Sequence, residues 1–390
     1  MQGLKTTPSN CTKKILILNS EYPPIGGGAG TATANLAHYM ATQGMEVKVI
    51  TARFGNLPAL DQSSGFDLIR IPAGRKKADR TNPGEQILFI FTSFWNSLSL
   101  FHQWKPDVIW TFFGFPGGVT ALMLKVLFGI PYIVSLRGGD VPGFRPYDFK
   151  VFHRIGGPII KIVWKHAKMV VANSRGLLQL AQNFYNRVPI RVIPNGVDLN
   201  YFKPAHRDGK TTQLLFVGRV VYQKGLDLLV QALGELPDSD WMLSIVGDGS
   251  YKDPLHELIK EKGLTQRIEF HGWCNKEELL PHLAKAHVFV NPSRHEGMPN
   301  AVLEAMACGL PIIATRIAGN EDLVRGGKNG FLVEAEGVKG LQKALRTLIN
   351  DRELCHKMGS ASRKLVEEQF SWVNSGEQYL QVLMDVAEKK

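Results

Sequence analysis

Short β-branched runs alternate with helical patterns along the whole chain, and this alternation restricts the fold more than any other feature of the sequence. Residues 14–19 form such a run. A glycine-rich loop and a helix over about residues 31–43 follow, and the next run spans residues 47–51. Parallel strands need long crossover connections, which helices provide. The sequence therefore predicts an α/β fold with parallel sheets.

The alternating pattern restarts near the middle of the chain. Further strands are predicted at residues 107–110, 132–135, 169–172, 214–217, 243–246, 267–270, 288–290 and 312–315. The turn-forming segment Pro194-Asn195-Gly196-Val197-Asp198 separates the two series. We therefore predict two doubly wound, Rossmann-like domains, residues 1–198 and 199–370, that face each other across a cleft. The ligand site is expected in that cleft, at the carboxyl ends of the strands.

Composition and cysteine spacing exclude several classes of protein. The 390 residues are 44% hydrophobic and 21% charged, which is ordinary globular usage. The four cysteines form no Cys-x-x-Cys pair, so neither a disulfide scaffold nor a clustered zinc site is expected. The apolar stretches 87–101 and 119–136 are interrupted by polar residues or proline, and the run 15–18 is too short for a signal peptide. We expect a cytoplasmic protein, or one peripheral to the cytoplasmic face of the membrane.

The positive charge of the chain is concentrated in its first half. Residues 1–200 hold 22 Lys and Arg against 10 Asp and Glu, whereas residues 201–390 hold 24 against 25. Within the first half, basic residues line helical faces around a Gly156-Gly157-Pro158 break that is expected to separate two helices. They are Lys150, Arg154, Lys161, Lys165 and Lys168. These faces are either solvated sides of core helices or a surface that meets anionic lipid.

A loop and a helix start within residues 291–309 form the most specific segment. A strand is predicted to end at Val290, Pro299 suits the first helical position because it lacks an N–H group, and Gly309 ends the helix. Free N–H groups and the helix dipole at such a start attract anions. The N–H groups concerned belong to Asn300, Ala301 and Val302. The segment predicts a cradle for a diphosphate.

Two glutamates flank this cradle. Glu304 lies five residues past Pro299, about 7.5 Å along the helix axis, where a carboxylate can bridge the two hydroxyls of a ribose. Glu296 precedes the helix and is expected on the other side of the phosphates. The alternative, two solvated surface glutamates, is disfavoured because apolar residues surround Glu304 in the sequence.

Two cations follow the predicted strand at residues 214–217. Arg219 lies in the turn after this strand, and Lys224 comes just before an amphipathic helix. Cations at the carboxyl end of a strand can hold a leaving diphosphate. Considered without the helix cradle, they are equally well read as ordinary surface cations.

Two loops of the first half carry further candidates. The glycine run that includes Gly27 and Gly28 allows a ligand to approach the backbone closely, but Thr31 occupies the third position of a dinucleotide fingerprint. The segment from Ser135 to Asp140 ends a strand with Arg137 and two glycines. It is either part of the site or a bare turn.

Together these motifs resemble those of the retaining GT-B glycosyltransferases of the family-four type, which move a sugar from a nucleoside diphosphate to an acceptor. The resemblance covers nearly the whole chain. It is carried by Gly27-Gly28, Pro194-Asn195-Gly196-Val197-Asp198, Val217-Gly218-Arg219 with Lys224-Gly225, Val246-Gly247-Asp248-Gly249, and the spacing of Glu296 and Glu304.

The resemblance implies roles for individual residues. Arg219 and Lys224 would hold the diphosphate, Glu304 the ribose, and Glu296 the sugar hydroxyls. The rest of the implied donor site is Gly27, Gly28, Gly247, Gly297, Met298, Pro299, Asn300 and Ala301. Residues 371–390 resemble the last helix of the family, which crosses back to the first domain.

The resemblance also implies a mechanism without metal or other cofactor. The departing phosphate of the donor would take the proton of the acceptor on the same face of the sugar. A covalent route would need a carboxylate nucleophile in the first domain, and only Asp140 stands out there. Many members of the family have His where this chain has Arg137, so a role that needs a histidine is not implied here. Arg137 is a catalytic candidate because an arginine could donate hydrogen bonds to the sugar or to an acceptor phosphate, although it cannot act as a base.

The leading hypothesis is a sugar transferase of cell-surface polysaccharide or glycolipid assembly. Its partners would be a nucleoside diphosphate sugar, a glycan or lipid-linked acceptor and an anionic membrane surface. No nucleic acid is expected, because carboxylates in the cleft would repel its phosphates. A sugar-nucleotide epimerase or phosphorylase on the same fold, or a basic lipid- or nucleic-acid-binding protein without enzymatic activity, remain as alternatives.

Overall fold

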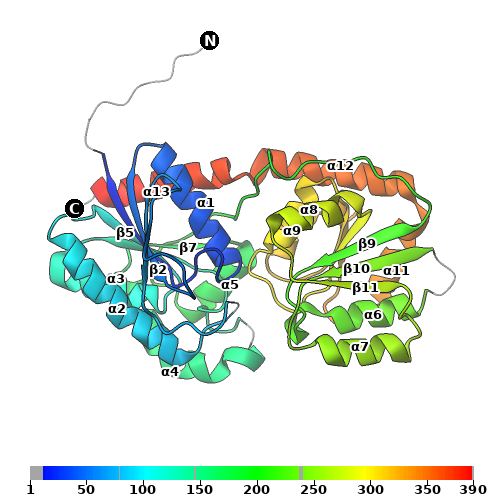
Figure 1. Cartoon of the computed structure of the whole chain (residues 1–390), viewed down its shortest axis with the longest axis horizontal. Helices are drawn as coiled ribbons and strands as arrows, with labels where there is room; N and C mark the ends of the chain where they lie inside the picture. The colour runs from blue at the N-terminus through cyan, green and yellow to red at the C-terminus, as the bar shows by residue number, and fades with distance from the viewer. Residues whose placement is uncertain (1–11, 79, 145, 237–239, 389–390) are drawn as a thin grey trace, which may run out of the picture.

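Two separate parallel sheets, one in each half of the chain, organise the molecule (Figure 1). The structure is a computed structural model. It describes residues 12–388 apart from residues 79, 145 and 237–239, and for residues 146–152 it describes the backbone alone. The two sheets confirm the α/β class and the pair of Rossmann-like units predicted from the strand pattern.

The first sheet has the strand order β3-β4-β2-β1-β5-β6-β7-β8, and only β3 runs antiparallel to its neighbour. Its strands are β1 (Lys14–Leu18), β2 (Glu46–Ala52), β3 (Leu60–Asp61), β4 (Asp67–Ile71), β5 (Val108–Phe112), β6 (Tyr132–Ser135), β7 (Met169–Ala172) and β8 (Ile190–Val192). Its helices are α1 (Gly28–Thr42), α2 (Pro83–Phe101), α3 (Gly117–Phe128), α4 (Pro146–His166), α5 (Arg175–Phe184) and α13 (Trp372–Glu388). One face packs against α2, α3, α4 and α5, and the other packs against α1 and α13.

The second sheet has the order β11-β10-β9-β12-β13-β14, with all strands parallel. Its strands are β9 (Thr212–Val217), β10 (Trp241–Val246), β11 (Ile268–Gly272), β12 (Val288–Asn291), β13 (Ile312–Thr315) and β14 (Gly330–Val333). Its helices are α6 (Leu226–Gly234), α7 (Lys252–Glu261), α8 (Lys276–Lys285), α9 (Asn300–Ala307), α10 (Asn320–Leu323), α11 (Val338–Asn350) and α12 (Arg352–Gln369). The helices α6, α7 and α11 cover one face, and α8 and α9 cover the other.

The strand order places a topological switch point in each sheet. In the first sheet it lies between β1 and β5, and in the second between β9 and β12. Ligands of such sheets bind at the carboxyl ends of the strands beside the switch point. The loops that follow these four strands are therefore the ones that position the site.

Two chain segments connect the halves, and they lie against each other. The N–H of Val197 donates to the carbonyl of Phe370 at 2.8 Å, and the Ser375 hydroxyl donates to the carbonyl of Pro194 at 2.8 Å. A Cβ on Gly196 would lie only 2.4 Å from the Trp372 nitrogen, so glycine is required at this contact. Beyond it, α13 packs on α1 in the first half of the chain.

Two predicted helix boundaries are wrong. The first helix begins at Gly28 rather than at Thr31, so the glycine run is part of the helix start. The helix α4 continues through Pro158 instead of breaking there. The residue before this proline is Gly157, which has no Cβ to collide with the proline ring, so one helix can accommodate it.

Gly247 has a structural role that its place in the donor motif does not reveal. Its φ is +139°, and an added Cβ would lie 1.9 Å from the carbonyl oxygen of Gly218. Glycine thus lets the loops after β9 and β10 touch, which sets the position of the neighbouring Arg219.

We predict that Gly247→Ala lowers the free energy of unfolding by about 3 kcal/mol or more, because it adds a backbone collision to an unfavourable φ. Urea denaturation measures the change. Gly263→Ala is the matched control, since its φ is +69° and no atom lies within 4 Å of the added Cβ. It should cost only about 1–2 kcal/mol. Equal losses in both variants would contradict the packing role of Gly247.

Candidate active site

The loops at the two switch points meet across the interface between the halves. A Cβ on Gly28, at the start of α1, would lie 3.4 Å from the Asn300 side-chain nitrogen at the start of α9. A Cβ on Gly297 would lie 3.1 Å from the Arg137 carbonyl oxygen. These close approaches bring together predicted site residues that are far apart in the sequence.

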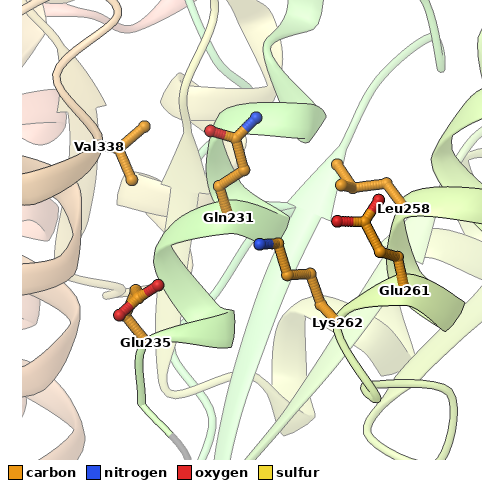
Figure 2. Close-up of a pocket in the computed structure, with 6 residues that line it drawn as sticks. All are labelled: Gln231, Glu235, Leu258, Glu261, Lys262 and Val338. Atoms are coloured by element: carbon orange, nitrogen blue, oxygen red, sulfur yellow. The ribbon is translucent and has the colours of Figure 1, made fainter.

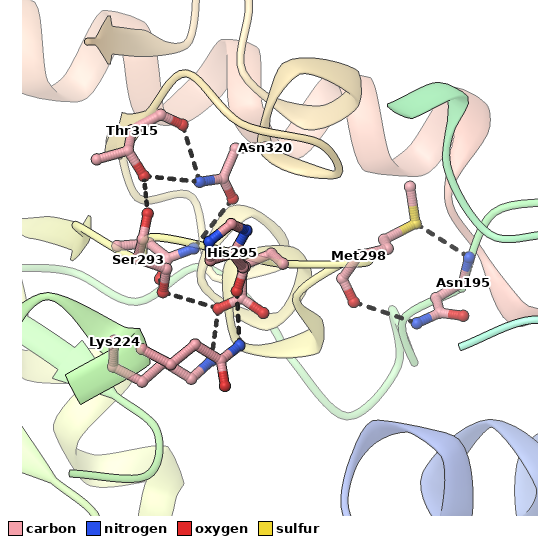
Figure 3. Close-up of polar contacts among 10 residues, drawn as sticks. Asn195, Lys224, Ser293, His295, Met298, Thr315 and Asn320 are labelled. Carbon is pink, nitrogen blue, oxygen red and sulfur yellow. Dashed lines mark hydrogen bonds and ion pairs between the residues drawn. The ribbon is translucent and has the colours of Figure 1, made fainter. Parts of the chain in front are cut away.

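Lys224 and Glu296 form an ion pair in the loops after β9 and β12 (Figure 3). The Lys224 Nζ lies 2.5 Å from Glu296 Oε1, and the Ser293 hydroxyl donates to the same oxygen at 2.8 Å. Both charged side chains are largely buried, at 15% and 9% exposure. The predicted phosphate-binding cation is thus neutralised by the predicted sugar-binding carboxylate, while Arg219 in the adjoining turn is exposed.

Arg294, two residues before Glu296, anchors the loop after β12. Sequence analysis did not identify it as a site residue. Its guanidinium donates two hydrogen bonds to the Asp227 carboxylate, at 2.8 and 2.7 Å, and two to Glu336, at 2.7 and 3.4 Å. It also stacks on the ring of Tyr222 at 3.9 Å. Asp227 follows Lys224 by three residues, so this buried pair fixes the Lys224 and Glu296 loops relative to each other. The only sequence feature that pointed to this pair was the position of Asp227, which closely follows the motif that contains Arg219 and Lys224.

The anion cradle at α9 is smaller than predicted. Pro299 is the N-cap in extended backbone, so the helix begins at Asn300. The N–H of Val302 donates to the Pro299 carbonyl at 3.2 Å and is therefore unavailable to a ligand. The cradle retains the N–H groups of Asn300 and Ala301, and the prediction for Val302 is wrong.

Glu304 lies one helical turn beyond Asn300, on the same side of α9. Both line a narrow hollow between the halves, together with Thr31, Asn35, Gly196, Val197, Asp198, Phe202, Lys276 and Trp372. Burial raises the pKa of Glu304 to about 7, and the charge of Lys276 opposes this to a smaller extent. A carboxyl group of this kind can accept hydrogen bonds from paired hydroxyls once it ionises.

Asn195 lies in the connecting segment Pro194–Asp198, which we call the hinge, and contacts the start of α9. It was not predicted as a site residue. Its Nδ2 donates to the Met298 carbonyl at 3.4 Å, and its backbone N–H points to the Met298 sulfur at 3.1 Å (Figure 3). The same Nδ2 also donates to Asn300 Oδ1 at 2.8 Å. The side chain of Asn300 is therefore oriented by a residue of the crossover segment. The Pro194–Asp198 motif contained Asn195, but sequence analysis used the motif as a domain boundary and a family signature and assigned Asn195 no role in the site.

The side chain of Arg137 contacts the segment that connects the two halves. Its guanidinium donates to Asn195 Oδ1 at 2.5 Å and to the Tyr379 hydroxyl of α13 at 3.4 Å, and it lies over the ring of Phe112. Burial lowers the pKa of Arg137, and Tyr379 and Asp140 partly offset this. The catalytic role implied for Arg137 stays a prediction, because these contacts by themselves describe a positioning residue.

Asp140 is held by backbone donors. Its carboxylate accepts hydrogen bonds from the N–H groups of Gly114 at 2.8 Å and Arg137 at 3.2 Å, and the side chain is buried. Burial raises the pKa of Asp140, while these N–H groups lower it. This arrangement joins the loops after β5 and β6, and the nucleophile role considered for Asp140 stays a prediction.

Glu21 is a further carboxylate of the site that the sequence did not single out. It accepts a hydrogen bond from the Gly27 N–H at 3.3 Å and so holds the glycine loop before α1. Burial raises the pKa of Glu21, and the charges of Arg75 and Arg219 together with the Gly27 N–H oppose this. Arg219 therefore lies near a carboxylate of the opposite half.

A larger hollow lies elsewhere in the second half and includes none of the predicted site residues (Figure 2). It has a volume of about 270 Å³ and is lined by Gln231, Glu235, Leu258, Glu261, Lys262 and Val338. In the described part of the chain, no three His, Cys, Asp or Glu side chains cluster so that they could hold a metal ion.

Two family matches together span most of the chain. The family of glycosyl transferases group 1 matches residues 198–365, and glycosyltransferase family 4 matches residues 26–201. An uncharacterized glycosyltransferase of Methanocaldococcus jannaschii is 32% identical over 68% of this chain and 72% of its own. The protein therefore belongs to the glycosyltransferases that combine these two family regions. Its two facing Rossmann-like domains are the GT-B fold.

Two further similarities bear on the comparison. A lipopolysaccharide core biosynthesis glycosyltransferase of Rhizobium meliloti is 29% identical over 56% of this chain and 65% of its own. The crystal structure of Anabaena HepE in complex with UDP and glucose superposes with a TM-score of 0.77 at 20% identity. It covers 95% of this chain and 99% of HepE. The latter similarity establishes the fold.

The pKa of Glu304 gives a testable pH dependence. Because the folded protein keeps a proton on Glu304 that the unfolded chain releases, the free energy of unfolding should fall as pH rises from about 4.5 to about 7. We expect Glu304→Gln to lose this part of the pH dependence in urea denaturation at pH 5 and pH 7.5. Glu257→Gln, at an exposed position of α7, is the control and should follow the wild type. Parallel curves for wild type and Glu304→Gln would contradict the assignment.

Proposed function

We propose that the protein transfers a sugar, with retention of anomeric configuration and without metal, from a nucleoside diphosphate sugar to a glycan or lipid-linked acceptor. The observation that carries the proposal is the meeting of the Lys224–Glu296 pair with the start of α9 beside the first half of the chain. We infer that these cations, the N–H groups at the start of α9 and the two carboxylates act together on one donor.

Each part of the donor has a chemically matched group. Arg219, Lys224 and the N–H groups of Asn300 and Ala301 suit a diphosphate, because they supply positive charge and donors at its two ends. Glu304 suits the ribose hydroxyls, and Glu296 suits those of the sugar. The UDP and glucose bound to HepE support a donor of this class.

The proposed reaction breaks the bond between the anomeric carbon and the β-phosphate oxygen. The acceptor oxygen bonds to the same carbon on the same face, and its proton passes to the departing phosphate. Arg219 and Lys224 stabilise the negative charge that develops on the leaving group. For Lys224 this requires that the diphosphate compete with Glu296 for the ammonium group.

The acceptor is expected in the first half of the chain. The excess of basic residues lies there, and so does the glycine loop held by Glu21 at the edge of the cleft. The relative from Rhizobium meliloti takes part in lipopolysaccharide core synthesis, which supports a glycan or glycolipid acceptor.

The role of the cations predicts that Arg219→Ala slows transfer by about 10²- to 10³-fold while the melting temperature changes little. Transfer is measured with a panel of nucleoside diphosphate sugars, preselected by thermal shift. Arg346→Ala, exposed on α11, is the matched control and should keep full activity. Chelator should leave turnover intact. Loss of activity in chelator with recovery on adding magnesium or manganese would overturn the metal-free mechanism.

Retention predicts a product whose new glycosidic bond has the same anomeric configuration as the donor sugar. Proton NMR of the first turnover products measures the coupling constant that reports it. An inverted product would refute the same-face reaction. Conversion of the sugar nucleotide into an isomer without any acceptor would favour the epimerase alternative.

A further inference from the structure

Exposed apolar side chains gather on three helices of the first half. Ten of the fourteen exposed large hydrophobic residues in the described part of the chain lie on α2, α3 and α4. They are Ile87, Leu88, Phe91, Trp95, Val126, Leu127, Phe128, Ile155, Ile159 and Ile162. Scattered exposed apolar residues are normal, but a gathering of this kind marks an interaction surface.

The three helices lie side by side, so these residues form one apolar face. The helix α3 packs against both α2 and α4, and the three lie on the side of the sheet away from α1 and α13 (Figure 1). On α2, Ile87, Phe91 and Trp95 are four residues apart and share one side of the helix. The exposed fractions of Phe91 and Trp95 are 56% and 65%, which is high for aromatic side chains.

Basic residues border this apolar face, whereas acidic residues are few in the same part of the sequence. On α4 the exposed Ile155, Ile159 and Ile162 run beside a second stripe of exposed basic residues. That stripe is Arg154, Lys161 and Lys165, and Lys168 follows the helix. Residues 86–197 contain 12 Lys and Arg but only three acidic residues, Asp107, Asp140 and Asp148. Asp140 is buried, and Asp107 accepts a hydrogen bond from the Lys14 N–H.

We propose that this α2–α3–α4 face docks on the surface of an anionic lipid bilayer, with Phe91 and Trp95 entering the headgroup layer and the basic stripe of α4 contacting lipid phosphates. Aromatic side chains favour the interface of a bilayer, and each basic residue near an anionic surface adds to the attraction. Among the described helices, none has the length and apolar character to cross a bilayer, so the contact is interfacial.

Charge distinguishes a bilayer from a second copy of the chain as the occupant. A two-fold dimer through this face would bury the same surface of both copies. It would therefore gather the stripe through Arg154, Lys161 and Lys165 from each copy in one partly dehydrated contact, which is unfavourable because like charges repel. An anionic bilayer meets both the apolar residues and the cations.

The helix α4 begins close to the second half of the chain. Its first residue, Pro146, comes two positions after Phe144, whose ring lies 6.3 Å from the ring of His295 in the opposite half. A bilayer under α4 would therefore lie near the place where the two halves meet, where a lipid-linked acceptor has to arrive. Docking itself needs no property of the sugar-transfer site, so it can fail or succeed independently of the proposed function.

The apolar part is tested by flotation with vesicles of neutral phosphatidylcholine, alone or with 30% phosphatidylglycerol. We expect wild type to float with the anionic vesicles only. Phe91→Ser combined with Trp95→Ser should weaken this binding roughly tenfold or more. Leu60→Ser combined with Val373→Ser removes two equally exposed apolar residues elsewhere and should bind like wild type. Thermal melting curves without ligand check that each variant is folded.

The basic part is tested by reversing two charges on α4. Lys161→Glu combined with Lys165→Glu should weaken anionic vesicle binding on the order of thirtyfold or more, which corresponds to about 1 kcal/mol for each lost basic residue. Lys339→Glu combined with Lys343→Glu on α11 makes the same reversal at the same spacing and should have little effect.

Tryptophan emission tests whether the face enters the headgroups. Trp95 and Trp273 are exposed, at 65% and 72%. Anionic vesicles should shift the emission of wild type and Trp273→Phe to shorter wavelength, and this shift should be lost in Trp95→Phe. The proposal is overturned by any of three results: no vesicle binding, binding unaffected by the α2 variant, or a dimer in sedimentation that this variant dissolves.

Discussion

The contact between the two crossover segments is the constraint on which the rest of the structure depends. Because Gly196 lies against the backbone of Trp372, the chain leaves and re-enters the first half at one place. Asn195 stands at this place and donates to both Met298 and Asn300, so the start of α9 takes its position from the hinge itself. Arg137 and Tyr379 extend this network into the first half. Any change of the angle between the domains must therefore move the start of α9.

Buried charges support the site on the opposite side of the same loop. Removing charges from water is costly, and ion pairs offset this only with good geometry. Arg294 meets the condition with a two-point contact to Asp227 and a further bond to Glu336. Such an arrangement adds little stability relative to apolar packing, but it restricts the orientation of the loop that carries Arg294. The same loop carries Glu296, so these contacts help to hold Glu296 against Lys224.

The sequence predicted what depends on local pattern. The β-branched runs predicted the positions of most strands. The change from a loop to a helical pattern predicted that Glu296 precedes a helix and that Glu304 lies on it. It failed where contacts join distant segments or where polar residues lie inside an element. The strand β4 was missed because Arg70 interrupts its apolar pattern, and only the structure shows that Asp61 pairs with it. Similarly, the pairing of Arg294 with Glu336 and of Asn195 with Asn300 has no local signal.

The ion pair of Lys224 and Glu296 limits how a donor can bind. At 15% and 9% exposure the two groups neutralise each other, so the cleft does not present the full charge of Lys224 to an approaching diphosphate. Arg219 is exposed and provides the first attraction. In the proposed reaction, a phosphate that bound the ammonium group would take a partner from the Glu296 carboxylate, to which Ser293 donates. Sugar hydroxyls would then replace the lost hydrogen bond. A donor that carries both phosphate and hydroxyl groups would satisfy both partners, whereas a free diphosphate would leave the buried carboxylate underpaired, so a site of this kind would discriminate between substrate and product.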